Sequence, residues 1–370
     1  MILITTQNFP PDRGGIEGLM GGLAEALAAA GHDTLVLADA ASSDQPLLNT
    51  RYRLRRIGGL RPWRRWRKAA VVRALVNSGG RSGADSETVH GIFADSWKSA
   101  EHIAGIGVPL AVLAHGMEFP SQPSARKAAR IRRALASATT VIANSSYTAR
   151  LVEPYVQGNT RVVVINPPIS PQPEAQAQSV TRLQRLLGGA GPVLATLARL
   201  EPRKGVDRVI RALSDIRARY PEATYLVAGQ GKDRARLQRL AEQLGVAPRV
   251  HFLGGIDDQQ KAALFSLSDV FVMPARREGN SVEGFGIVYR EAGWYGVPVL
   301  AGRDGGAVDA VAGETGLLCD GADPDDVTTQ LLRMLDDGEN RQKMGERASS
   351  LARGPAQWRE AVAVFVDCLR

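Results

Sequence analysis

Residues 193–228 read VLATLARLEPRKGVDRVIRALSDIRARYPEATYLVA. This pattern predicts a strand at 193–197, a cationic loop, an amphipathic helix at 205–220 and a second strand at 224–228. Short apolar strands joined by such a helix are typical of a parallel sheet with helices on both faces. These residues therefore predict an α/β fold.

The alternation of strand and helix continues on both sides of this unit. The other expected strands are 2–5, 34–38, 88–90, 110–114, 140–143, 162–165, 250–253, 270–273 and 297–301. A proline-rich stretch that begins at Pro167 interrupts the alternation. We therefore predict two doubly wound, Rossmann-like domains that face each other across a cleft, at 1–168 and 191–354, with a linker at 169–190.

The composition excludes several classes of protein. With 370 residues, 44% of them hydrophobic and 23% charged, the chain has the composition of a soluble globular protein of two domains. No apolar run approaches the ~20 residues that span a bilayer, and the first residues lack the features of a signal peptide. Cys319 and Cys368 lack metal-ligand spacing, which argues against a zinc site or a disulfide framework. We expect a cytoplasmic protein.

Two loops at expected strand ends carry groups that suit an anion. In open parallel sheets, ligands bind beyond the carboxyl ends of the strands. Gly14 and Gly15 begin a helix and can bring N–H groups close to an anion, although such pairs also form simple tight turns. Arg199, Arg203 and Lys204 gather three cations in six residues, which suits a bound polyanion; a solvated charged loop is the alternative.

Two further loops offer carboxylates and a histidine. Glu283 and Glu291 are expected to lie about 12 Å apart, too far for an acid/base pair on one bond but suited to the two hydroxyl-bearing ends of one ligand. Gly284 and Gly286 stand at the start of the same helix, where N–H groups could hold a phosphate. His115 follows a strand and is a candidate polar contact, with a structural role as the alternative.

Taken in order, these motifs resemble those of the retaining glycosyltransferases of family 4. The resemblance is carried by Gly14-Gly15-Ile16-Glu17, by Arg199 with Arg203-Lys204-Gly205, and by Glu283-x7-Glu291 followed by Gly296-Val-Pro-Val. It extends from Pro10 to about Leu335. Members of this family are two-domain enzymes of the GT-B fold that use nucleotide sugars. The resemblance implies an N-terminal acceptor-binding domain, a C-terminal nucleotide-sugar-binding domain, and a last helix at 355–370 that crosses back onto the first domain.

The resemblance also implies a role for the residues around the diphosphate. Gly15, with Gly14 beside it, would offer its backbone N–H to the donor diphosphate. Arg199 and Lys204 would clamp the same group with charge-assisted hydrogen bonds. His115 would contact the donor sugar near the reacting carbon.

The remaining donor residues follow from the same resemblance. Glu291 would accept the ribose hydroxyls, and Leu253 would lie beside the base. Glu283, helped by the backbone of Gly284, Phe285 and Gly286, would hold a hydroxyl of the donor sugar.

The family's retention of configuration implies front-face substitution, in which the leaving diphosphate takes the acceptor's proton. The residues expected to act in catalysis are His115, Arg199, Lys204 and Glu283. Nothing among these motifs resembles a metal-binding box, so no metal and no other cofactor is expected. A nucleotide-sugar epimerase of the same fold is the alternative, whereas the fingerprint of an NAD-dependent oxidoreductase is lacking.

The donor and acceptor are less clearly marked. The basic loop 275–282 before Glu283 resembles that of mannosyltransferases of lipid and polysaccharide assembly, which slightly favours GDP-mannose as donor. We therefore expect transfer of a hexose, of mannose or glucose type, to a hydroxyl of a lipid-linked or glycan acceptor.

The net charge of +8 is confined to the first half of the chain. Residues 1–170 hold 20 Lys and Arg against 12 Asp and Glu, whereas residues 171–370 hold 26 against 26. From 51 to 73 the sequence has ten cations and no acid. Trp63 and Trp66 are expected on one apolar face of a helix there, which is typical of a surface on anionic lipid; a helix docked on the sheet with a solvated basic rim is the alternative.

The residues expected to contact membrane or acceptor are Arg61, Trp63, Arg64, Arg65, Trp66, Arg67 and Lys68. We expect a peripheral protein on the inner face of a membrane. Single-stranded nucleic acid can also bind arginine-rich stretches with aromatic residues. No recognised nucleic-acid module appears, so we expect no nucleic-acid partner.

Overall fold

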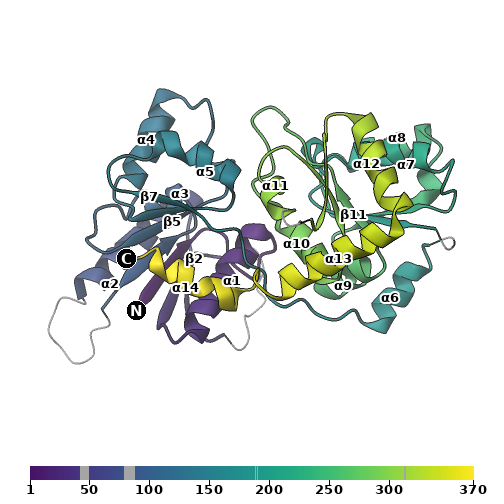
Figure 1. Cartoon of the computed structure of the whole chain (residues 1–370). Coiled ribbons are helices and arrows are strands. Elements are labelled where there is room, and N and C mark those ends of the chain that lie inside the picture. Colours follow the sequence, from purple (N-terminus) through teal and green to yellow (C-terminus); the bar gives the residue numbers. More distant parts are fainter. Residues whose placement is uncertain (42–49, 79–87, 188, 190, 312–313) are drawn as a thin grey trace. The chain divides into compact units, whose positions relative to one another are not determined.

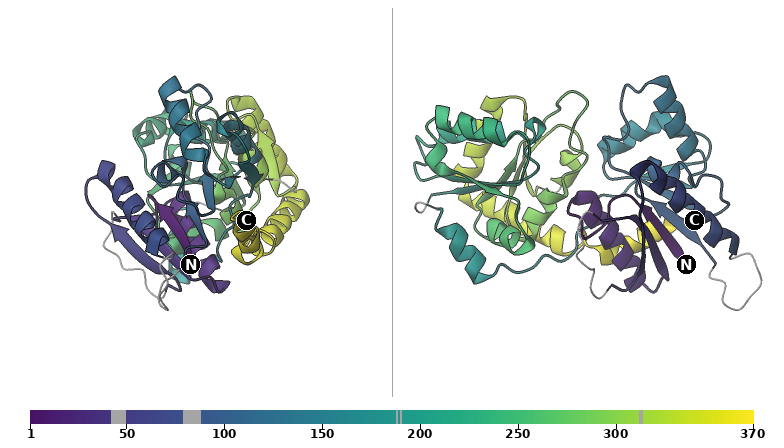
Figure 2. Two further views of the ribbon diagram at one scale, coloured as in Figure 1. Left: turned by 90° about the vertical axis from the view of Figure 1, so that its left-hand side faces the viewer. Right: turned by 180° about the vertical axis from the view of Figure 1, so that it is seen from behind.

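The computed structural model of the chain describes residues 1–41, 50–78, 88–187, 189, 191–311 and 314–370. The chain divides into two compact units (Figures 1 and 2). Unit 1 consists of Met1–Ser170 and Ala356–Arg370, and unit 2 consists of Pro171–Pro355. Each unit holds one parallel sheet with a hydrophobic core on each of its faces, which confirms the predicted α/β class.

Unit 1 contains seven parallel strands in the order β3-β2-β1-β4-β5-β6-β7. The strands are β1 Ile2–Thr6, β2 Thr34–Asp39, β3 Arg53–Ile57, β4 Gly91–Ala94, β5 Leu110–Ala114, β6 Thr140–Ala143 and β7 Arg161–Val164. The helices are α1 Gly15–Ala29, α2 Arg61–Ser78, α3 Trp97–Ala100, α4 Ala125–Leu135, α5 Ser146–Val152 and α14 Trp358–Asp367, with a 3₁₀ turn at Glu153–Tyr155.

Two strands of unit 1 differ from the prediction. The strand expected at 88–90 lies at Gly91–Ala94 instead, because Ile92 and Phe93 are the residues that fill the two faces of the sheet. The edge strand β3 was not expected. In this strand Arg53 and Arg55 are exposed, Leu54 and Arg56 are half-buried, and Ile57 is buried. Part of the basic stretch is therefore a half-covered strand.

Unit 2 contains six parallel strands in the order β10-β9-β8-β11-β12-β13. The strands are β8 Val193–Leu197, β9 Thr224–Ala228, β10 Val250–Gly254, β11 Val270–Met273, β12 Val299–Gly302 and β13 Gly316–Cys319. The helices are α6 Ala177–Gln184, α7 Val206–Ile216, α8 Arg234–Gln243, α9 Asp258–Ser266, α10 Ile287–Trp294, α11 Ala307–Ala310, α12 Pro324–Asp336 and α13 Gly338–Arg353, with 3₁₀ turns at Pro202–Lys204 and Ala247–Arg249.

The segment predicted as a linker contains a helix. Helix α6 packs against α9, and its Leu183 is buried in the core of unit 2. The polar residues that made this segment resemble a linker lie on the exposed side of a short amphipathic helix.

The last helix belongs to unit 1, where α14 packs against α1 (Figure 1). Glycines make room for large side chains of this helix and of the residues that follow it. A Cβ atom on Gly22 would lie 2.1 Å from the indole Nε1 of Trp358, and one on Gly91 would lie 2.6 Å from Leu369 Cδ1. The docking of this helix therefore depends on residues that lack a side chain on α1 and β4.

The strand orders fix where each unit can bind a ligand. The strands stay parallel, but the side on which successive strands are added to the sheet reverses between β1 and β4 in unit 1 and between β8 and β11 in unit 2. The loops that leave such neighbouring strands diverge to opposite faces and open a crevice at the carboxyl edge. The loop after β8 carries the cationic motif and the loop after β11 carries Glu283, so the topology brings these two motifs together.

Candidate functional site

The centre of the site in unit 2 is a buried ion-pair cluster around Glu283. Lys204 Nζ and Arg203 Nη1 both contact Oε2 of Glu283, the second at 3.1 Å. Arg203 Nε also lies 2.9 Å from Glu201 Oε2. The side chains of Arg203 and Lys204 are only 7% and 11% exposed, so the cations are fixed before any ligand arrives.

The pKa values of this pair reflect both burial and charge. Burial lowers the pKa of Lys204 below its ordinary value, although the neighbouring Glu283 acts in the opposite direction. Burial alone would raise the pKa of Glu283, but the ion pairs with Lys204 and Arg203 outweigh it and lower that pKa. Glu283 is therefore a weak base, which suits a hydrogen-bond acceptor better than a general base.

The second cation beside Glu283 is Arg203, whereas Arg199, predicted to bind the diphosphate with Lys204, lies at the surface. Arg199 is 71% exposed, and its Nη1 lies 3.1 Å from Glu201 Oε1. Both arginines occur in the same short cationic run, so the signal for Arg203 was present. Sequence spacing could not show which of the two would be buried.

The backbone brings the two loops into direct contact. Gly205 has a φ angle of 73°, and a Cβ atom there would lie 2.3 Å from the carbonyl oxygen of Pro274. Gly205 therefore serves both a left-handed turn and the close approach of the loops after β8 and β11.

Helix α10 carries Glu291, which is held by Lys261, a residue outside the predicted motifs. Lys261 Nζ on α9 donates to Glu291 Oε1 at 2.8 Å. The two side chains are 15% and 19% exposed. Leu253, at the end of β10, is half-buried against the core of the same unit.

The two residues before α10, Phe285 and Gly286, are fixed by contacts with the helix. Gly286 caps the helix with a φ angle of 83°, and a Cβ atom there would meet the ring of Tyr289 at 2.4 Å. Phe285 is only 2% exposed and lies beneath the guanidinium of Arg290, at 4.8 Å from its ring centroid. Only the backbone of Phe285 is therefore suitably placed to meet a donor.

Residues 293–295, at the end of α10, pack against other segments of unit 2. Gly293 lies against α13, where a Cβ atom would come within 3.2 Å of Ala348. Trp294 faces the Arg353 guanidinium, 5.0 Å from the ring centroid, and Tyr295 Oη donates to the Pro173 carbonyl at 2.6 Å. The glycine permits close helix packing, and the two aromatic residues secure the flanking segments.

In unit 1, His115 is held by Asp95 and Glu118. Its Nε2 lies 2.8 Å from the Asp95 carbonyl oxygen, and its backbone N–H donates to Glu118 Oε1 at 2.6 Å. A carbonyl only accepts hydrogen bonds, so Nε2 carries a proton and Nδ1 of the neutral ring is an acceptor.

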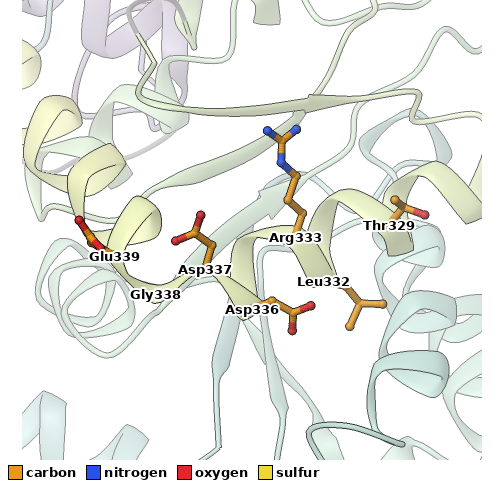
Figure 3. Close-up of a pocket in the computed structure, with 7 residues that line it drawn as sticks. All are labelled: Thr329, Leu332, Arg333, Asp336, Asp337, Gly338 and Glu339. Atoms are coloured by element: carbon orange, nitrogen blue, oxygen red, sulfur yellow. The ribbon is translucent and has the colours of Figure 1, made fainter.

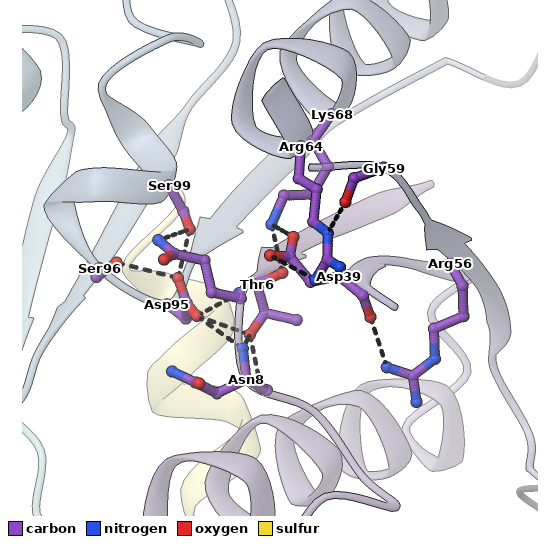
Figure 4. Close-up of polar contacts among 11 residues, drawn as sticks. Thr6, Asn8, Asp39, Arg56, Gly59, Arg64, Lys68, Asp95, Ser96 and Ser99 are labelled. Carbon is purple, nitrogen blue, oxygen red and sulfur yellow. Dashed lines mark hydrogen bonds and ion pairs between the residues drawn. The ribbon is translucent and has the colours of Figure 1, made fainter. Parts of the chain in front are cut away.

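Asp95 is the centre of a polar network at the β1–β4 reversal (Figure 4). Its carboxylate accepts from the Thr6 hydroxyl at 2.8 Å, the Gln7 N–H at 2.6 Å and the Ser99 hydroxyl at 2.5 Å. The network ties the start of the β1–α1 loop to α3. The same loop leads to Gly14 and Gly15, and the Glu17 side chain lies over Gly14, whose added Cβ would be 2.2 Å from Glu17 Oε2.

The structure changes the interpretation of the basic helix α2. Lys68, expected at the membrane or acceptor, is 2% exposed; its Nζ contacts Asp39 Oδ1 at 2.6 Å and donates to the Thr6 carbonyl at 2.5 Å (Figure 4). Ala69 and Val72 form the packed face instead of the tryptophans. Trp63 and Trp66 are 64% and 57% exposed.

Three other arginines of α2 contact the turn before the helix or an acidic side chain. Arg64 Nε and Arg67 Nη1 donate to the carbonyls of Gly59 and Gly58 at 2.7 and 2.6 Å. Arg65 lies 4.0 Å from Glu101. The Arg61 side chain lies outside what the structure describes.

An open hollow of about 730 Å³ lies between α12 and α13 (Figure 3). It is lined by Thr329, Leu332, Arg333, Asp336, Asp337, Gly338 and Glu339. None of these residues belongs to a predicted motif. Within the described residues, no group of three or more His, Cys, Asp or Glu side chains is placed to hold a metal ion.

The chain matches two family models and several characterised proteins. Residues 13–172 match "Glycosyltransferase Family 4" and residues 181–351 match "Glycosyl transferases group 1". Over 204 residues it is 42% identical to the GDP-mannose-dependent alpha-(1-6)-phosphatidylinositol monomannoside mannosyltransferase of Mycolicibacterium smegmatis, covering 54% of this chain and 52% of that protein. Over 183 residues it is 40% identical to the GDP-mannose-dependent monoacylated alpha-(1-6)-phosphatidylinositol monomannoside mannosyltransferase of Corynebacterium glutamicum, covering 49% and 47%.

These alignments span about half the length of the relatives, whereas the structural likenesses span whole chains. Anabaena HepE, solved with UDP, has a TM-score of 0.79 at 20% identity and covers 100% of this chain and 99% of its own. Sucrose-phosphate synthase of Thermosynechococcus elongatus has a TM-score of 0.78 at 21% identity, with 99% and 97% covered. The structural likenesses identify the fold as GT-B. The two family models show that the chain is a glycosyltransferase with a family 4 domain at residues 13–172 and a group 1 domain at residues 181–351.

Proposed function

We propose that this protein is a retaining mannosyltransferase that moves mannose from GDP-mannose to a hydroxyl of a phosphatidylinositol-type glycolipid. The observation that carries the proposal is the buried cluster in which Lys204 and Arg203 converge on Glu283 at the β8–β11 reversal. Such a cluster suits a nucleotide sugar, because the cations can bind its diphosphate and the carboxylate can accept a hydrogen bond from a hydroxyl of its sugar.

The charge in this reaction develops on the leaving diphosphate. Lys204 carries three N–H donors and the Arg203 guanidinium five, so the bonds to Glu283 and Glu201 leave donors for phosphate oxygens. Fixed cations stabilise the departing charge without reorganisation. Arg199 is exposed and would close onto the same diphosphate.

Front-face substitution gives the proton a defined destination. The bond from the anomeric carbon to the diphosphate oxygen breaks, the acceptor oxygen bonds on the same face, and the acceptor's proton passes to the leaving diphosphate. The lowered pKa of Glu283 supports this course, because a carboxylate paired with two cations is a poor nucleophile and a weak base. The free Nδ1 of His115 would accept a hydrogen bond from a donor-sugar hydroxyl.

The nucleoside end of the donor would meet α10. Lys261 donates to Oε1 of Glu291 and thereby fixes the carboxylate, whose other oxygen would accept the ribose hydroxyls. Leu253 would lie beside the base.

The names of the relatives favour mannose as the sugar and a phosphatidylinositol glycolipid as the acceptor. These relatives are transferases, which favours transfer over the epimerase alternative. We propose that the reaction needs no metal, since the cations of the 199–204 loop would neutralise the diphosphate themselves.

The decisive test is a panel of nucleoside diphosphate sugars incubated with mannolipid acceptors in the presence of a chelator. GDP-mannose should give GDP and a mannosylated lipid, with the α-configuration retained in the product by NMR. Isomerised nucleotide sugar without transfer would favour the epimerase. Loss of activity with the chelator, restored by added metal, would contradict metal independence.

We also propose that α2 docks on an anionic membrane at the cytoplasmic face. Leu60, Trp63 and Trp66 are 73%, 64% and 57% exposed, and the exposed Arg67 lies on the same helix. Exposed tryptophans beside arginines match the interface of an anionic bilayer. No helix among the described residues has the length and apolarity needed to cross a bilayer.

This docking predicts that the protein co-sediments with phosphatidylglycerol-containing liposomes at low salt and is released as salt screens the charges. Trp63→Ser should weaken binding roughly 30-fold, because about 2 kcal/mol of apolar transfer is lost. Val364→Ser, at an exposed apolar residue on α14 of the same unit, serves as the control and should bind normally. Equal binding to neutral and anionic liposomes would refute the docking.

A further inference from the structure

Arg276 is a buried arginine that the proposed reaction does not use. It opens the loop between β11 and Glu283, and it is only 8% exposed. Its Nη1 and Nη2 contact Asp207 Oδ1 and Oδ2 at 2.9 and 3.2 Å, a two-pronged pair with a carboxylate that is 6% exposed. The charge of Arg276 is therefore neutralised inside the unit instead of being offered to a donor.

The partner residue lies just beyond the cationic loop. Asp207 stands in the first turn of α7, three residues after Lys204. The backbone N–H of Arg276 donates to the Arg203 carbonyl at 2.9 Å. Arg276 thus holds the cationic loop through its main chain and the following helix through its side chain.

The other anchors of the two loops show what this pair contributes. The Glu283 end is held independently, because the Gly306 N–H donates to the Glu283 carbonyl at 2.9 Å. The early part of the cationic loop is held by the Leu200 N–H, which donates to the Gln230 carbonyl at 2.9 Å. Arg276, next to the close approach of Gly205 to Pro274, hydrogen-bonds the Arg203–Lys204 part of the loop to the chain that leads to Glu283.

We infer that Arg276 and Asp207 are a positioning pair that sets Arg203 and Lys204 at the place relative to Glu283 that turnover requires, without either residue touching the donor. The inference rests on the proposed function of this cluster. A displacement of about 1 Å in such a cluster costs roughly 100-fold in rate, so a pair that only positions can have a large kinetic effect.

The test uses the full chain with the double substitution Arg276→Met and Asp207→Asn, which removes both charges and leaves neither buried without a partner. We expect faster hydrogen–deuterium exchange in both 199–206 and 274–286. We expect kcat with GDP-mannose to fall roughly 10- to 100-fold, while the Kd for GDP changes by less than about 3-fold. Arg276→Lys, which cannot form the two-pronged pair, should give an intermediate kcat.

The matched control is Arg219→Met with Asp336→Asn, an ion pair at 2.7 Å in the same unit and distant from the motif loops in sequence. It should leave exchange of 199–206 and kcat at wild-type values. Unchanged exchange of 199–206 in the Arg276/Asp207 variant would overturn the inference. So would faster exchange accompanied by a normal kcat.

The exchange measurement needs no nucleotide, so the two proposals fail separately. A wild-type protein that binds no GDP and turns over no GDP-mannose would refute the proposed function. The coupling of the two loops through Arg276 and Asp207 would still be confirmed or refuted by exchange.

Discussion

Replacing Lys204 with methionine is expected to lower donor turnover ~10²–10³-fold while unit 2 stays folded. The ammonium is a fixed donor to the charge that develops on the leaving diphosphate, and a methionine of similar length supplies none. Arg203 keeps its contact with Glu283 at 3.1 Å, so the carboxylate retains one cation. The measurement is the rate of GDP release from GDP-mannose, with circular dichroism to verify the fold.

Arg199→Met should also lower turnover, through an arginine that is 71% exposed before the donor binds. Lys343→Met is a matched control, since Lys343 lies in the same unit, is 55% exposed and pairs with Glu339 on its own helix. It should turn over normally. Near-normal rates in both the Lys204 and Arg199 variants would refute the cationic clamp.

The largest expected effect on stability comes from Glu283→Gln, which should lower the free energy of unfolding by about 3 kcal/mol at pH 7. The carboxylate is 13% exposed and neutralises both Lys204 and Arg203, so its loss leaves two buried cations facing an amide. Urea unfolding measures the change. Glu339→Gln, at a surface glutamate whose side chain is 80% exposed, should behave as wild type within experimental error.

The same variant predicts a pH dependence whose sign is fixed. The pKa of Glu283 is lower in the folded protein than its ordinary value, so the folded state binds fewer protons than the unfolded state. The contribution of Glu283 to the free energy of unfolding is complete above the ordinary glutamate pKa of about 4.3. It is lost as the pH falls through the lower pKa that Glu283 has in the folded protein. The difference between wild type and Glu283→Gln should therefore narrow below about pH 4. A difference that stays constant down to pH 3 would contradict the assignment.

The fold could be predicted well where buried strands alternate with amphipathic helices. The strands at 193–197, 224–228 and 270–273 match β8, β9 and β11. The edge strand at Arg53–Ile57 was missed because its exposed arginines and single buried end resemble a charged loop. Helix α6 was missed because a short surface helix with one buried leucine has little periodic signal.

The site was predicted in part, and the errors have one cause. The sequence selected Lys204, Glu283 and Glu291, and the structure places the first two in contact. It did not show that Arg203 would be the buried cation beside Glu283, and it placed Lys68 at the surface although that ammonium lies inside unit 1 against Asp39. Burial of a cation depends on a carboxylate far away in the chain, which local spacing cannot reveal.

The sequence by itself determined that the chain forms two parallel α/β sheets, and that cations, glycines and glutamates stand at the carboxyl ends of their strands. Those features follow from short-range periodicity and from the conformations that glycine permits. Only the tertiary structure decided that β8 lies beside β11, that Arg203 and Lys204 contact the same oxygen of Glu283, and that Arg276 forms an ion pair with Asp207. These outcomes depend on which residues distant in sequence are packed together out of water, because packing determines which charges must be paired.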